Sequence, residues 1–89
     1  ELSLERCNIT SLAALPVELC ETIEVFKLSG NEGIDISTFS KRMPRLQELS
    51  LNRCKITSLA AFHAEQFDML EVLDLSGNIG LNISTLHQI

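Results

Sequence analysis

Apolar and polar residues alternate in four short segments of this chain. In each segment one polar residue lies between two apolar residues. The segments are residues 2–4, 26–28, 49–51 and 73–75. Because successive side chains of a β-strand point to opposite faces, this alternation predicts four short strands with one buried and one exposed face. We expect the leucines of these segments, and Phe26 in the second, to point inward.

The segments recur at a nearly constant interval. Each segment ends in a leucine, and these final leucines lie 23 or 24 residues apart. Longer stretches repeat as well. Residues 1–15 match residues 48–62 at twelve of fifteen positions, and residues 26–38 resemble residues 73–85, both at an offset of 47 residues. Self-similarity at a period of roughly 20–50 residues is typical of solenoids.

Two kinds of unit therefore alternate, and we call them A units and B units. The A units are residues 1–22 and 46–69, and the B units are residues 23–45 and 70–89. Each unit can bury its apolar side only against its neighbours, so we expect a single structural unit. The strands would stack into a parallel sheet at ~4.8 Å spacing. The predicted return segments behind that sheet are residues 12–22, 37–45, 58–69 and 84–89.

The returns carry mixed signals. Alanine pairs at residues 13–14 and 60–61 favour helix. Pro16 and Pro44 instead indicate that some returns are short, broken or 3₁₀-like.

A cysteine or an asparagine follows each predicted strand at the same distance, three residues after the leucine that ends the segment. The resulting frame, LxxLxLxx(N/C)xL, resembles the leucine-rich repeat family over essentially the whole chain. This resemblance implies an α/β solenoid with short parallel strands on a concave face and helical or irregular returns on a convex face. An asparagine there can donate and accept hydrogen bonds within the turn, and a thiol is a weak donor. The predicted structural turn residues are Cys7, Asn31, Cys54 and Asn78.

The alternation resembles particular members of the family. Cys-x-Ile-Thr follows the strand in the A units, whereas Ser-Gly-Asn-x-Gly follows it in the B units. Such alternation is similar to ribonuclease inhibitor and to cytosolic nucleotide-binding leucine-rich-repeat receptors, which implies a cytosolic scaffold that binds proteins. The repeat length of 23–24 residues and the phrase at residues 70–78 also look like the repeats of toll-like receptors.

The outward strand positions form the candidate binding surface, since the concave sheet is the usual binding face of a solenoid. The surface is polar and mildly acidic, and the chain contains no Trp or Tyr of the kind that dominates binding hot spots. The alternative is that these positions are simply solvated. Arg6, Arg53, Lys27 and Asp74 are the best candidates for charge-assisted anchoring of a partner. The remaining concave-face candidates are Ser3, Glu5, Ser50, Asn52 and Ser76.

Other functions find little support. The net charge of −5 with no basic stripe argues against nucleic-acid binding, and no apolar run is long enough to insert into a membrane. His63 and His87 occupy similar places in successive units, but zinc normally needs three or four ligands, so we predict no metal and no cofactor. No catalytic constellation emerges from the spacing, and we expect no enzymatic activity.

Cysteine usage and glycosylation motifs point in different directions. The three cysteines have no evident pairing, which favours reduced core thiols and a cytoplasmic setting. Asn8-Ile9-Thr10 and Asn82-Ile83-Ser84 are N-glycosylation acceptors by sequence and leave an extracellular setting open.

Neither end shows a polar cap, so we expect a slice of a longer array that self-associates through its ends if it exists alone. We predict a non-catalytic protein-interaction or scaffold segment whose partner is another protein. The alternatives are an ectodomain segment of a ligand-sensing innate-immune-type receptor, a repeat domain attached to an enzyme such as a ubiquitin ligase, and an engineered fragment.

Overall fold

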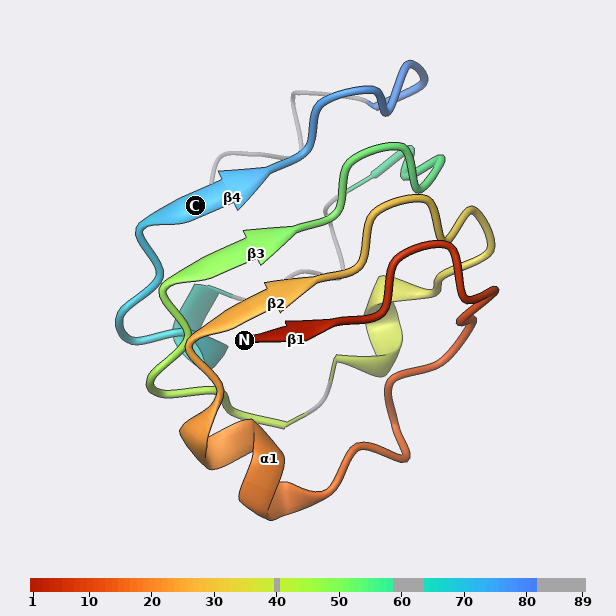
Figure 1. Cartoon of the computed structure of the whole chain (residues 1–89). Coiled ribbons are helices and arrows are strands. Elements are labelled where there is room, and N and C mark those ends of the chain that lie inside the picture. The colour runs from red at the N-terminus through yellow and green to blue at the C-terminus, as the bar shows by residue number, and fades with distance from the viewer. Residues whose placement is uncertain (40, 59–63, 82–89) are drawn as a thin grey trace.

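The computed structural model describes residues 1–39, 41–58 and 64–81, and they form a small α/β domain with one parallel sheet (Figure 1). The four strands are ordered β1-β2-β3-β4, so strands that follow one another in sequence are neighbours in space. This confirms the prediction of four short parallel strands stacked in chain order. The strands are β1 (Leu2–Ser3), β2 (Val25–Lys27), β3 (Glu48–Ser50) and β4 (Val72–Asp74).

The strands pair in the register that aligns equivalent positions of the units. Lys27 lies opposite Ser3 on one side and Ser50 on the other, and Ser50 lies opposite Asp74. Backbone hydrogen bonds continue beyond the strands, as in the 2.9 Å bond from the amide of Arg6 to the carbonyl of Ser29. The sheet therefore extends into the turns that follow it.

Helix is sparse, and it lies in the return segments (Figure 1). The helices of the described residues are α1 (Val17–Thr22) and two 3₁₀ turns, η1 (Ile36–Thr38) and η2 (Ala64–Gln66). The helix expected at Ala13 and Ala14 is absent, because these residues form a turn in which the Ala13 amide donates to Ser11 Oγ. The α-helix begins only after Pro16, which is its N-cap residue and has an extended backbone conformation. Residues 60–61 and 84–89 lie outside the described residues.

The core lies between the sheet and the returns. Phe26, Leu28, Leu49 and Leu51 have no exposed surface, as their inward positions predict. The leucines of β1 and β4 and of the turns after them are only half-buried, because each of these strands has a neighbour on one side alone among the described strands. From the returns, the rings of Phe39 and Phe67 meet edge to face with centroids 6.1 Å apart. The half-buried leucines are Leu2, Leu4, Leu73 and Leu75.

Candidate interaction surface

Each strand ends in a turn that needs a left-handed residue. In all four units the backbone has a positive φ two residues after the leucine that ends the strand segment. Glycine adopts this conformation without steric cost, and the B units place glycine there, whereas the A units place arginine. The residues and their φ angles are Arg6 (54°), Gly30 (77°), Arg53 (57°) and Gly77 (78°).

The arginine of each A unit lies over the glycine of the next B unit. A Cβ atom on Gly30 would lie 2.7 Å from Cγ of Arg6, and one on Gly77 would lie 2.7 Å from Cγ of Arg53. The aliphatic stem of the arginine thus fills the space that the missing side chain leaves. This contact gives a physical reason for the alternation of arginine and glycine along the chain.

Asn31 connects the first B unit to the first A unit through four hydrogen bonds. Its Oδ1 accepts from the amides of Cys7 and Ile9, both at 3.0 Å, and its Nδ2 donates to the carbonyls of Leu4 at 3.0 Å and Leu28 at 2.7 Å. The asparagine is completely buried. Its side chain therefore satisfies four backbone groups of two successive turns.

Asn78 repeats this arrangement between the second pair of units. Its Oδ1 accepts from the amides of Cys54 and Ile56, and its Nδ2 donates to the carbonyls of Leu51 and Leu75, with all four distances between 2.8 and 3.0 Å. The two asparagines form a buried ladder, which is consistent with the predicted role of this position in the turn.

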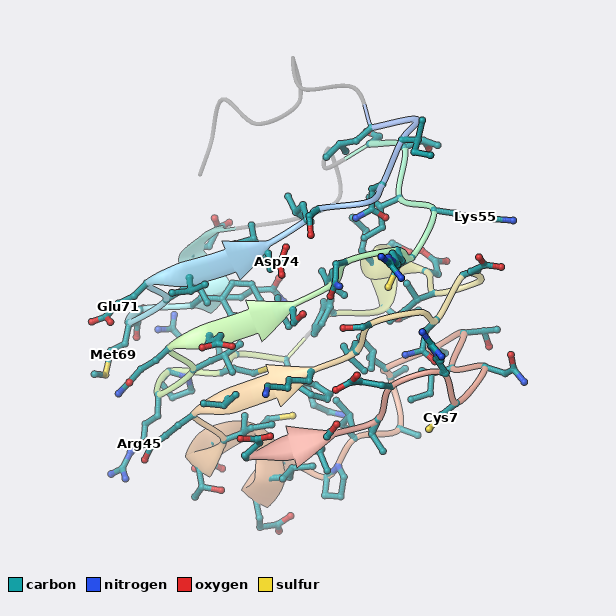
Figure 2. All side chains as sticks on the ribbon, turned by 45° about the horizontal axis from the view of Figure 1, so that its top comes forward. Cys7, Arg45, Lys55, Met69, Glu71 and Asp74 are labelled. Atoms are coloured by element: carbon teal, nitrogen blue, oxygen red, sulfur yellow. The ribbon has the colours of Figure 1, made fainter. Side chains whose placement is uncertain are left out.

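The two equivalent cysteines differ, and the prediction that all three thiols lie in the core is wrong for one of them. Cys54 is 1% exposed and its Sγ donates to the carbonyl of Leu28 in the preceding unit at 3.2 Å. Cys7 is exposed, and it follows β1, which has no neighbour on its outer side among the described strands. Figure 2 shows the Cys7 side chain pointing away from the molecule at this edge. Cys20 is buried as expected, and none of the three forms a disulfide.

The outward side chains of the strands form a row across the sheet, which we call the strand face. Ser3, Lys27, Ser50 and Asp74 lie in register, as the sequence predicts. Lys27 Nζ lies 3.4 Å from Glu1 Oε2. Two hydrogen bonds from Ser76, one from its amide and one from its hydroxyl, lower the pKa of the Asp74 carboxyl. The face therefore carries a cation on β2 and an anion on β4.

A second row lies where the strands end. The hydroxyl of Ser29 donates to Asn52 Oδ1 at 2.5 Å, and the hydroxyl of Ser50 donates to the same oxygen at 2.6 Å. At the β1 edge, Ser3 Oγ donates to Glu5 Oε1 at 3.0 Å. These polar groups satisfy one another and give this end of the face a hydrogen-bonded surface.

The predicted binding residues differ in how much they offer to a partner. Ser50 is only 8% exposed and presents little surface. Lys27, Asn52 and Asp74 are half-buried. The candidates that are exposed are Ser3, Glu5, Arg6, Arg53 and Ser76.

The structure has a further feature that the sequence did not predict. An open hollow of about 590 Å³ lies between the turns after β3 and β4, lined by Arg53, Lys55 and Ile79 among others. Lys55 Nζ pairs with Glu32 Oε1 at 3.5 Å on its rim, and Ile79 is 99% exposed. The available signal was that isoleucine occupies in the second B unit the place of Glu32 in the first.

Among the described residues there is neither a cluster of metal-binding side chains nor a helix that could span a membrane. No group of three or more His, Cys, Asp or Glu side chains suited to a metal ion occurs there. His63 and His87, named above as a weak metal pair, lie outside these ranges, as does the second glycosylation motif at Asn82. No helix within residues 1–39, 41–58 and 64–81 is long and apolar enough to cross a bilayer.

Comparisons with protein-family models, with curated proteins and with solved structures found no match for this chain.

Proposed function

We propose that this chain is a segment of a leucine-rich repeat solenoid, with the strand face as its concave side. Three features support the proposal. The strands recur every 23–24 residues, they pair in the register of the repeat, and Asn31 and Asn78 bond both to their own turn and to the turn before. The repeat is one supersecondary unit that buries its apolar side only by stacking.

Its function, in this proposal, is to bind another protein in the cytoplasm as a non-catalytic scaffold. The observation that carries it is the strand face, where Lys27, Val72 and Asp74 share one side of a sheet built on a buried hydrogen-bond ladder. A rigid sheet presents such side chains at a low entropic cost of binding. Arg6 and Arg53 extend the face at the strand ends and can pair with carboxylates.

Site-specific photo-cross-linking tests this function in cells that express the protein. A photoreactive residue replaces Val72 on the strand face, and its matched control replaces Val17 on α1, because the two valines are similarly exposed at 49% and 53%. We expect position 72 to capture one defined protein, and the Lys27→Glu variant to reduce that capture. Equal capture from both positions, or none from position 72, would contradict the proposal.

A receptor ectodomain segment is the second candidate, and the first glycosylation motif favours it. Asn8 is exposed beyond the end of β1, with a positive φ of 56°, so its side chain is open to solvent. Expression in a secretory host with the Asn8→Gln variant as control decides this point. A glycan on Asn8 that is lost in the variant would support the ectodomain, and its absence would favour the cytoplasmic scaffold.

A further inference from the structure

Two arginines occupy equivalent places beyond the strands and have no charged partner. Arg6 and Arg53 are exposed, and neither forms an ion pair within residues 1–39, 41–58 and 64–81. Arg53 follows β3, which has a described strand on each side, so its exposure comes from the conformation of its own turn. Both guanidinium groups are therefore free to bind a ligand.

The aliphatic stems of these arginines are held in place. Cγ of Arg6 lies over Gly30 and Cγ of Arg53 lies over Gly77, where an added Cβ atom would come within 2.7 Å of each. The same contact therefore fixes the start of both side chains. Because the stems pack on the backbone of the next unit, less rotamer freedom is lost when the guanidinium groups bind.

Asn52 adds hydrogen-bond donors beside the arginines. Its Oδ1 accepts from the hydroxyls of Ser29 and Ser50, so this oxygen is satisfied and only the Nδ2 group remains available. Nδ2 makes no hydrogen bond within the part of the chain that the structure describes. The carbonyl of Asn52 accepts from the Gly30 amide at 3.0 Å, which places this residue beside the turn that the Arg6 stem covers.

The free groups of these three side chains are donors and require acceptors from a ligand. A guanidinium group has only N–H donors, and two parallel N–H groups match the two oxygens of a carboxylate. Arg6 follows β1 and Arg53 follows β3, so they lie two strand spacings apart, which is roughly 10 Å at ~4.8 Å per strand. A ligand that fits both arginines must therefore present two carboxylates at about this separation.

An extended acidic peptide meets this requirement. In a polyproline II segment, the side chains of residues three positions apart point the same way and lie roughly 9 Å apart, at about 3.1 Å per residue. In a β-strand, residues two positions apart share a face but lie only about 7 Å apart. Nucleic acid fits less well, because it carries a charge at every nucleotide and the protein itself has a net charge of −5.

We propose that Arg6, Asn52 and Arg53 bind an extended acidic segment of another protein, which crosses the strand ends in a polyproline II conformation. Each arginine pairs with one carboxylate of two acidic residues that lie three positions apart in that segment. The Nδ2 group of Asn52 donates to a backbone carbonyl between these residues, since polyproline II leaves its backbone groups unpaired. This inference rests on the proposed function and names the chemistry of the partner.

Fluorescence anisotropy with labelled peptides tests the spacing. The probe is a proline-rich peptide with two glutamates three positions apart. The comparison peptides have the two glutamates two positions apart, or have glutamines in their place. We expect the probe to bind about fivefold more tightly than the peptide with the shorter spacing, because only the probe engages both arginines. The glutamine peptide should show no saturable binding.

Variants of the protein test the residues. Arg6→Gln and Arg53→Gln keep the stem over the glycine and remove the charge, so each weakens binding of the probe by about fivefold and leaves the fold intact. Asn52→Asp still accepts from both hydroxyls but loses its donors, and it also weakens binding. The matched control is Arg45→Gln, which should bind like the native protein, because Arg45 is exposed and lies at the other end of the strands (Figure 2).

Three results would overturn the proposal. One is equal binding of the peptides with the two spacings. Another is an equal effect of Arg53→Gln and Arg45→Gln, which would reduce the interaction to net charge. The third is tighter binding of a single-stranded oligonucleotide than of the probe, which would make phosphates the ligand of this site.

The photo-cross-linking experiment above separates this inference from the proposed function. A partner captured equally from position 72 of the native protein and of an Arg6→Gln, Arg53→Gln double variant would support the function and contradict only the acidic segment. Absence of capture from position 72, together with the expected peptide binding, would count against the function alone.

Discussion

Asn31 links two neighbouring units because its side-chain amide pairs with four backbone groups at once. It accepts from two amides and donates to two carbonyls, which uses both donors and both acceptor lone pairs of the side chain. An aspartate could not donate there, and an apolar residue could neither donate nor accept. The side chain thus takes the place of regular backbone pairing where the chain turns out of the sheet.

Removing this side chain should destabilise the protein severely. Asn31→Ala leaves three buried or partly buried backbone groups without this partner and the carbonyl of Leu28 with only the Cys54 thiol as a donor, and we expect a loss of about 3 kcal/mol or more in the free energy of unfolding. Asn52→Ala is the control, because Asn52 is half-buried and only accepts from two hydroxyls, so its loss costs less than about 1 kcal/mol. Urea unfolding measures both, and equal losses would contradict the ladder.

The three thiols should differ in reactivity. Burial raises the pKa of Cys20 and of Cys54, so both thiols stay protonated as well as covered at neutral pH. Cys7 is exposed and should react quickly. In dilute solution, labelling should modify one thiol rapidly and the other two only after unfolding, as peptide mass spectrometry will show. Rapid labelling of Cys54 would contradict its position in the turn.

Among the elements, the strands are alike in sequence but unequal in burial. β2 and β3 are flanked on both sides, whereas β1 and β4 form the edges of the described sheet. Short strands of two or three residues contribute few backbone bonds each. Their stability must therefore come from the side chains packed beneath them and from the turns beyond.

Equivalent leucines should accordingly differ in their contribution to stability. Leu51 has no exposed surface, so Leu51→Ala should cost about 2–5 kcal/mol. Leu75 occupies the same position after β4 but is half-buried, so Leu75→Ala should cost clearly less. Urea unfolding of both variants provides the comparison. Equal costs would show that the edge is as well packed as the centre.

At the scale of the whole molecule, two carboxylates make the stability of the folded protein depend on pH in the acid range. Hydrogen bonds from the hydroxyl and amide of Ser37 lower the pKa of Asp35, and the amide and hydroxyl of Ser76 lower that of Asp74. Their folded pKa values thus lie below the unfolded value of about 3.9. The stability they contribute is complete above the unfolded pKa and is lost as pH falls through the folded pKa.

Thermal unfolding across this acid range should reveal the contribution. We expect the melting temperature to fall more steeply below about pH 4 in the native chain than in a Ser37→Ala, Ser76→Ala double variant. Ser11→Ala is the control, because the hydrogen bond of its hydroxyl is accepted from the backbone amide of Ala13 and not made with a carboxylate. If the melting temperatures of the native chain and the double variant fell equally with pH, these hydrogen bonds would not contribute to stability.

Much of the fold could be predicted because the same hydrophobic pattern occurs in all four units. Four recurrences of the leucine frame gave the number, order and register of the strands, since each unit can bury its leucines only by aligning with its neighbours. The candidate site was less predictable. Exposure of Ser50 and Cys7 depends on what stands beside them, and Ile79 stands out only when its surroundings are known.

The sequence by itself determined the repeat, the inward leucines and the asparagines of the turns, because these follow from period and residue type. Tertiary structure alone decided that Arg6 and Arg53 cover the glycines of the next unit. It also decided that Cys54 is buried while the equivalent Cys7 is exposed. The physical reason is that a residue's burial in a stacked fold depends on the neighbouring unit, which local sequence does not encode.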